Sequence, residues 1–252
     1  MPPPLELAGS RLTGRVVPRA DVSAATRAAM RALFAAYFED VTEAAFEADL
    51  AEKDRVLLME DDAGVLRGFS TLLRYERTLD GQPVAVYFSG DTLIDRAFWG
   101  ETVLPRLWAQ TVFACAAEDA PTPAYWFLIA SGYKTYRFLP TFFETFYPTP
   151  RAPTPPDVQR LLDALAQERY GDRYQGGVVR LEHATPLREG VAAIDERRRA
   201  DPFVAFFERA NAGHARGDEL ACLTRLAPDN VTPAGRRMLG LPPVAPPPSP
   251  PP

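Results

Sequence analysis

The segment from Arg55 to Glu144 alternates apolar runs and turns in an order that restricts the fold more than any other feature of the chain. The turn Asp61-Asp-Ala-Gly64 separates two apolar runs, and this pattern predicts a β-hairpin. A second tight turn, over 79–82, precedes a third run, which we expect to pair antiparallel with the second. In order, the pattern predicts strands over 55–60, 65–75 and 83–93, a helix from 99 to 119, a strand over 125–130 and a helix after 132.

The flanking sequences predict further elements and a simple division of the chain. Asp21 or Ser23 can cap a helix that reaches Phe38, and Thr42 can cap a shorter one. The remaining expected elements are a strand over 13–17, a helix over 156–170, a strand over 177–183, a helix over 202–211, a strand over 220–226 and a final helical turn within 231–239. We expect a loose segment at 1–11, one domain over 12–240 with a Pro-rich insertion and helix near 148–175, and a disordered Pro-rich tail at 241–252.

Charge and composition argue against several kinds of partner. The net charge is −5 and no long basic block occurs, so binding to nucleic acid is not expected. No apolar run reaches the roughly 20 residues of a membrane-spanning helix, and the N-terminus lacks the basic and then apolar pattern of a signal peptide. We therefore expect a cytoplasmic protein with free thiols at Cys115 and Cys222. Lysine occurs only at Lys53 and Lys134, and this preference for arginine is typical of a GC-rich bacterial genome.

Three short segments could carry chemistry. Ser89-Gly90-Asp91-Thr92 interrupts the third strand, and a glycine there indicates a bulge or the close approach of another backbone. Asp91 could cap a turn or act as a chemical group, and the residues leave both open. The segment 95–102 opens a helix, whose free N–H groups suit a phosphate, although an acidic first turn is also ordinary for a helix. The segment 131–138 brings two tyrosines, Tyr133 and Tyr136, which are either buried core residues or hydroxyl donors.

This succession of elements and segments resembles the GCN5-related N-acetyltransferase (GNAT) family. The resemblance implies an α/β fold with a mixed, mostly antiparallel sheet and helices on both faces, over 12–147 and completed by 176–227. It implies transfer of an acyl group from a thioester to a small-molecule amine. Asp91 would accept the amine proton, and Tyr136 would protonate the departing thiolate, with Tyr133 at the entrance. The residues that would hold the donor are Ser89, Gly90, Thr92, Leu93, Arg96, Trp99, Gly100 and Thr102.

The phosphate loop departs from the family pattern, in which Gln or Arg is followed by two residues and then Gly. Here Arg96 and Gly100 are one residue further apart. The donor could therefore be acyl-CoA in a shifted loop or a phosphopantetheine-linked acyl group on an acyl carrier protein. The rivals are a non-catalytic ligand-binding or interaction protein on the same fold, or a Pro-rich tail that docks elsewhere. His183 and His214 are scattered, so no metal site is expected. The aromatic groups at 126–147 and 203–207 predict core packing, or in part an apolar pocket.

Overall fold

The structure, a computed structural model, describes residues 4–79, 81–181, 185–191 and 193–242. One sheet runs through it in the order β1-β2-β3-β4-β5-β6-β9-β8-β7. Within the described residues, β5–β6 is the parallel pair and the other pairs are antiparallel, so the predicted mixed, mostly antiparallel sheet is confirmed. The strands are β1 (Leu5–Glu6), β2 (Leu12–Pro18), β3 (Arg55–Asp61), β4 (Leu66–Leu79), β5 (Gln82–Ile94), β6 (Ala124–Ala130), β7 (Tyr174–Gln175), β8 (Val178–Val179) and β9 (Glu219–Arg225).

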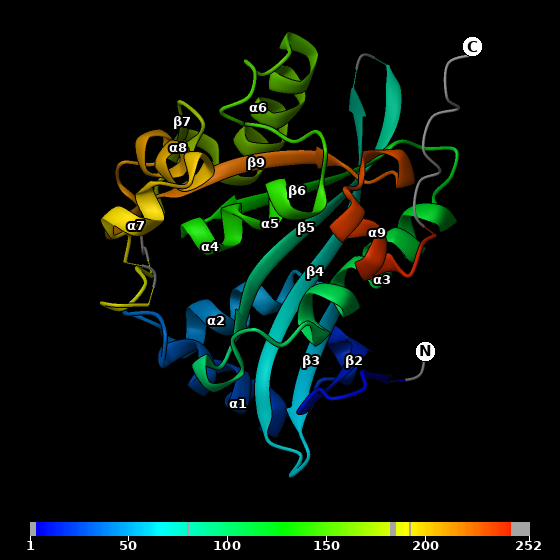
Figure 1. The fold of residues 1–252 in the computed structure, drawn as a ribbon, viewed down its shortest axis with the longest axis vertical. Helices are drawn as coiled ribbons and strands as arrows, with labels where there is room; N and C mark the ends of the chain where they lie inside the picture. Colours follow the sequence, from blue (N-terminus) through cyan, green and yellow to red (C-terminus); the bar gives the residue numbers. More distant parts are fainter. Residues whose placement is uncertain (1–3, 80, 182–184, 192, 243–252) are drawn as a thin grey trace, which may run out of the picture.

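Helices cover both faces of this sheet. Successive side chains of a strand point to opposite faces, and apolar side chains on both faces are buried against the helices. One face, here called the α3 face, packs against α3, α4, α5, α8 and α9. The opposite α1 face packs against α1 and α2 on one half and against α6 on the other. Figure 1 shows α1 and α2 in blue beside β4, and α6 in green near β9. The helices are α1 (Ala24–Ala35), α2 (Glu43–Ala51), α3 (Val103–Glu118), α4 (Tyr133–Tyr136), α5 (Phe138–Phe142), α6 (Pro156–Tyr170), α7 (Glu196–Arg199), α8 (Pro202–Ala210) and α9 (Pro233–Leu239).

The first two helices begin where their capping residues predict. The Ser23 hydroxyl accepts a hydrogen bond from the amide of Thr26, and the Thr42 hydroxyl accepts one from Ala45. Each cap satisfies one of the amides that a helix start leaves without a partner. The helix that the sequence predicts over 156–170 is also present with those bounds.

Other elements differ from the expectation. The helix expected from Trp99 begins at Val103, because a 3₁₀ turn over Arg96–Phe98 precedes it. The segment expected to be loose contains β1, which pairs with β2. The strand expected over 177–183 is the two-residue β8, and His183 lies outside the described residues, as does the tail from residue 243.

Candidate functional site

A β-bulge interrupts the pairing of β4 with β5. Ser89 pairs with Leu72 and Thr92 pairs with Ser70, so Gly90 and Asp91 together oppose the single residue Thr71. A bulge bends its strand and turns side chains away from the regular alternation. The sequence prediction of a bulge at Gly90 is therefore confirmed.

The partner on the other side of β5 is lost at the same level. The parallel ladder between β5 and β6 ends with the pair Ser89 and Leu128. β5 continues to Ile94 without this partner, whereas β6 continues to Ala130 paired with β9. The two strands therefore separate beyond Ser89, and the edge of β5 that faced β6 is left for another group, because backbone N–H and C=O groups need partners.

A cavity of about 600 Å³ lies at this separation. Its walls come from both faces of the sheet: Phe46 and Asp49 belong to α2 on the α1 face, whereas Leu104 and Trp108 belong to α3 on the opposite face. The bulge residues Gly90 and Asp91 lie between them, in the wall of the same cavity. The cavity thus reaches both faces of the sheet beside an unpaired strand edge.

Three carboxylates line the α1 side of the cavity: Asp49 on α2, Asp91 on β5 and Glu219 on β9. Burial raises the pKa of Asp91 toward neutrality, Asp49 raises it further, and Lys53 lowers it. Burial also raises the pKa of Glu219, and the charges of Asp91 and Asp49 raise it further. Because burial disfavours the charged form, Asp91 and Glu219 hold protons at a pH at which ordinary carboxyl groups have lost them.

Lys53 is the buried cation of this group. Its Nζ lies 2.6 Å from Oδ1 of Asp49 and donates to the carbonyl oxygen of the same residue at 2.8 Å. Its stem packs over Gly90, where a β-carbon would lie 2.6 Å from Cε of Lys53 and 2.5 Å from Oγ1 of Thr71. Close packing against Lys53 and Thr71 therefore excludes a side chain at position 90, and the bulge is a second reason for glycine there.

Ser89 faces the opposite side, where its hydroxyl contacts two indole rings. Nε1 of Trp108 and Nε1 of Trp126 each donate to Oγ of Ser89 at 2.9 Å. The two indole rings lie 4.1 Å apart between centroids. All three residues line the cavity, so its α3 side is aromatic and nearly uncharged at this depth.

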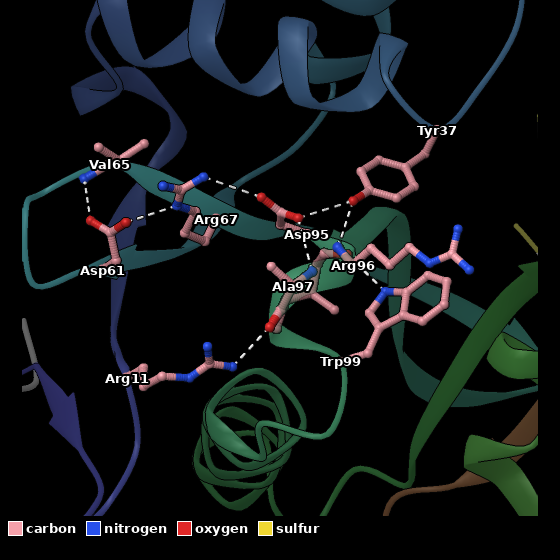
Figure 2. Close-up of polar contacts among 10 residues, drawn as sticks. Arg11, Tyr37, Asp61, Val65, Arg67, Asp95, Arg96, Ala97 and Trp99 are labelled. Atoms are coloured by element: carbon pink, nitrogen blue, oxygen red, sulfur yellow. Dashed lines mark hydrogen bonds and ion pairs between the residues drawn. The ribbon is translucent and has the colours of Figure 1, made fainter.

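The loop from β5 to α3 is fixed by polar contacts on three sides. Asp95 accepts from Arg67 of β4 and from the Tyr37 hydroxyl, each at 3.2 Å. The Tyr37 hydroxyl in turn accepts from the amide of Arg96, and Arg11 donates to the carbonyl of Ala97 at 2.8 Å. Figure 2 shows Asp95 between Arg67 and Tyr37, with Arg11 reaching the loop from below. The loop shape is therefore set by neighbouring side chains and not by a run of glycines.

These contacts also neutralise the two acidic residues of the loop. Asp95 is paired with Arg67, and Glu101 accepts from Ser10 and Arg11. The hydrogen bond from Ser10 and the Arg11 guanidinium lower the pKa of Glu101. Both charges are thus offset from outside the cavity, which reduces their repulsion toward a bound anion.

Beyond the loop, two cations flank an exposed indole at the cavity mouth. Trp99 is 39% exposed, and its Nε1 donates to the carbonyl of Ile94 at 3.1 Å. Nζ of Lys134 lies 3.3 Å from the centroid of this ring, and the Arg96 guanidinium lies 5.2 Å from it. Burial, together with the charges of Arg198 and Arg96, lowers the pKa of Lys134 to about 8. Thr102 precedes α3 and its side chain makes no cap hydrogen bond, so no capping side chain among the described residues bonds the first-turn amides near Gly100.

The residues predicted from the sequence divide into two groups. The cavity wall contains Ser89, Gly90, Asp91, Thr92, Leu93, Trp99 and Gly100. Arg96 and Thr102 are neighbours of this wall and not part of it, although Arg96 approaches Trp99.

Tyr136 lies elsewhere. Its side chain is 0% exposed, its hydroxyl donates to the carbonyl of Pro148 at 2.9 Å, and its ring packs against Phe206 and Phe207. Burial raises its pKa far above the ordinary value. This hydroxyl is engaged in the core, and the structure does not bring it together with Asp91. Tyr133 is likewise buried and absent from the cavity wall.

Sequence reasoning missed Asp49, Lys53 and Glu219. Asp49 and Lys53 are four residues apart, and this spacing places them on one side of a helical turn. Glu219 is an acidic first residue of a strand, but only the order β5-β6-β9 brings it near Asp91. In the described part of the chain, no group of three or more His, Cys, Asp or Glu side chains is placed to hold a metal ion. No described helix has the length and apolarity to cross a membrane.

Comparisons with known proteins find similarity in structure. No family model and no curated protein matches the sequence. The GNAT-family N-acetyltransferase YhbS of Escherichia coli, solved with CoA, is 19% identical with a TM-score of 0.39, over 53% of this chain and 69% of YhbS. ElaA of Escherichia coli is 20% identical with a TM-score of 0.36, over 56% of this chain and 94% of ElaA.

A probable N-acyltransferase of Enterococcus faecalis V583 is 16% identical, with a TM-score of 0.40. That match covers 54% of this chain, which spans only 33% of the Enterococcus protein. These similarities concern the fold alone.

Proposed function

We propose that the protein is an acyltransferase that moves an acyl group from a thioester donor to an amine. The observation that carries this proposal is the placement of Asp91, a carboxylate with a raised pKa, at the point where β5 separates from β6 beside a cavity. An unpaired strand edge supplies fixed backbone dipoles for a developing oxyanion. A carboxylate that titrates toward neutrality is suited to accept a proton from an attacking ammonium or amine.

The donor is proposed to lie on the α3 side of the cavity. Its phosphates would meet the uncapped start of α3 near Gly100, together with Lys134 and Arg96 around Trp99. Helix N-termini and cations both favour phosphate. The acyl thioester would then extend toward Ser89. Acyl-CoA fits this arrangement, and a phosphopantetheine arm on an acyl carrier protein would use the inner part of it.

The acceptor is proposed to lie on the α1 side, where the carboxylates favour a cationic amine. The amine nitrogen attacks the thioester carbonyl carbon, and Asp91 takes the proton that the nitrogen loses. Strand amides between Ser89 and Leu93 hold the negative charge on the carbonyl oxygen. The carbon–sulfur bond then breaks, an amide is formed, and the thiolate takes a proton from water. Holding both reactants in one cavity contributes to the rate through proximity.

Calorimetry and an acceptor screen test this function. Purified protein is titrated with acetyl-CoA, longer acyl-CoA and acyl-phosphopantetheine, and release of free thiol is followed with a panel of amines. We expect binding of at least one donor and amine-dependent thiol release that Asp91→Asn reduces. A folded protein that binds no donor would contradict the proposal.

A non-catalytic binding protein is the second candidate. The contact of Lys134 with Trp99 favours this second candidate. A bulky indole occupies the loop at which the donor phosphates would bind, whereas small residues there would let the backbone approach a phosphate closely. This candidate predicts that an amine binds with no donor present and that no thiol is released with any donor. The same titrations therefore separate the two functions.

A further inference from the structure

The hydroxyl of Ser89 has an unusual set of partners. Its oxygen accepts hydrogen bonds from two indole N–H groups, each at 2.9 Å. The residue is 8% exposed and lies in the cavity wall, where β5 has its last pair with β6. Sequence reasoning places Ser89 at the site only through its backbone.

A serine hydroxyl has one hydrogen to donate and two lone pairs to accept with. The indoles of Trp108 and Trp126 can only donate, so they occupy both lone pairs. The hydrogen of Ser89 remains, and among the described residues the Ser89 hydroxyl donates no hydrogen bond. Because the two indole N–H groups occupy the acceptor positions of the oxygen, the hydroxyl hydrogen can donate a hydrogen bond to a ligand in the cavity.

We propose that the Ser89 hydroxyl donates a hydrogen bond to the carbonyl oxygen of the bound thioester and to the oxyanion formed from it. This inference rests on the proposed function and extends it by one side chain. Two N–H groups that donate to an oxygen polarise its O–H bond and strengthen it as a donor. The interaction is stronger in the transition state than in the ground state, because the carbonyl oxygen becomes negative there.

Ser89 acts in the reaction only as a hydrogen-bond donor. The amine attacks the carbonyl carbon, the electron pair of the C=O bond moves to oxygen, and it returns when the carbon–sulfur bond breaks. Ser89 shares its hydrogen throughout and transfers none. The proton of the amine goes to Asp91, which lies on the other side of β5.

Infrared spectroscopy of bound donor tests this role without knowledge of the acceptor. Acetyl-CoA with a ¹³C-labelled carbonyl is bound to the protein, and the carbonyl stretch is isolated by isotope difference. A hydrogen bond lowers this frequency, so we expect a lower value in the wild type than in Ser89→Ala. Thr224→Val is the matched control, because it removes a buried hydroxyl that donates to the carbonyl of Thr145 at 2.7 Å and lies outside the cavity wall. It should leave the frequency unchanged.

A second comparison covers the case in which Ser89→Ala fails to fold. In Trp108→Phe and Trp126→Phe the serine is retained, but each variant loses one polarising N–H group. We expect the carbonyl frequency to rise in each toward that of free acetyl-CoA. A purely structural serine predicts no change in frequency.

Kinetics supply an independent reading. Removal of one oxyanion donor lowers kcat by about 10²- to 10³-fold, and we expect this for Ser89→Ala with donor affinity changed by less than about 3-fold. If no donor binds the wild type, the proposed function fails, and this inference fails with it. If donor binds and the carbonyl frequency is the same in the wild type and the Ser89 and Trp variants, the inference alone is overturned.

Discussion

Asp91 on β5 raises the pKa of Glu219 on β9, although β6 lies between these two strands in the sheet. This coupling across β6 arises because β5 separates from β6 beyond Ser89, which lets both carboxylates reach one cavity. The pKa of Glu219 is higher than that of Asp91, so Glu219 is still neutral while Asp91 ionises, and the charge formed on Asp91 then disfavours ionisation of Glu219. The pKa of Glu219 is therefore set partly by a residue 128 positions earlier in the chain.

The first prediction concerns the pH dependence of acyl transfer. The proton acceptor must be ionised, so kcat/KM should rise with pH through the raised pKa of Asp91, well above the ordinary carboxyl range. Asp91→Asn should lower kcat by about 10²- to 10⁴-fold, which is typical for a positioned base.

Asp49→Asn is the informative companion variant. It removes the neighbouring negative charge that raises the pKa of Asp91, and it retains Asp91, Glu219 and Lys53. The pH–rate profile should move to lower pH because Asp91 then ionises more easily. An unshifted profile would show that Asp91 titrates independently of Asp49, and retained activity in Asp91→Asn would remove Asp91 from the mechanism.

The second prediction is that the raised pKa of Asp91 makes stability depend on pH. Its pKa is higher in the folded than in the unfolded chain, so folding binds a proton and stability falls as pH rises from about 4 through the folded value. Asp91→Asn removes this loss and should raise the free energy of unfolding by about 1 to 2 kcal/mol at pH 8, with no gain at pH 4. Denaturant titrations at the two pH values measure it. Asp229→Asn is the control, because Asp229 is paired with Arg225 and its pKa is lowered; it should give no gain at pH 8.

Much of the sheet could be predicted because its signals are local. The turn residues between 61 and 64 and the apolar runs on either side determine the β3–β4 hairpin, and the glycine at position 90 indicates the bulge. The capping hydroxyls of Ser23 and Thr42 fix two helix starts. Each of these features depends on neighbours in the sequence, so a single sequence contains it.

The site was only partly predictable because its composition depends on contacts between distant segments. Glu219 reaches Asp91 only through the order of β5, β6 and β9. The start of α3 is displaced to Val103 because Arg11, Arg67 and Tyr37 hold the preceding turn, and no pattern within 95–102 contains that information. Tyr136 looked like a site residue by its position, but the carbonyl of Pro148 takes its hydroxyl.

The third prediction is that Gly90 accepts no side chain. A β-carbon there would overlap Thr71 and the buried stem of Lys53, so Gly90→Ala should lower the free energy of unfolding by about 1 to 3 kcal/mol. Thr71→Ala in the same chain removes one of the two overlapping atoms and should recover part of the loss. A double-mutant cycle measured by denaturant unfolding gives the coupling, and additive effects would contradict the packing argument.

The fourth prediction concerns Lys134 and the donor phosphates. Lys134 has a pKa of about 8 and is charged below it, so CoA affinity should fall as pH rises from 7 to 9. Arginine stays charged over this range, so Lys134→Arg should bind CoA with little pH dependence. Lys134→Met should bind about 5- to 10-fold more weakly at pH 7, as expected for the loss of one charge-assisted hydrogen bond. Calorimetry at several pH values measures these affinities. The same dependence of CoA affinity on pH in the wild type and in Lys134→Arg would show that the phosphates bind elsewhere.

The last prediction is that Tyr136→Phe changes stability and leaves catalysis nearly intact. The hydroxyl of Tyr136 is committed to the carbonyl of Pro148 within a cluster of phenylalanines. Its loss should lower the free energy of unfolding by about 1 kcal/mol, the typical net contribution of one hydrogen bond. Tyr174→Phe offers a matched control, because it also removes a buried tyrosine hydroxyl, one that donates to Asp163 at 2.6 Å. Both variants should retain kcat within about 2-fold, since water protonates the thiolate in the proposed mechanism; a selective loss of about 10²-fold in Tyr136→Phe, the usual effect of losing a proton donor, would instead return this tyrosine to the reaction.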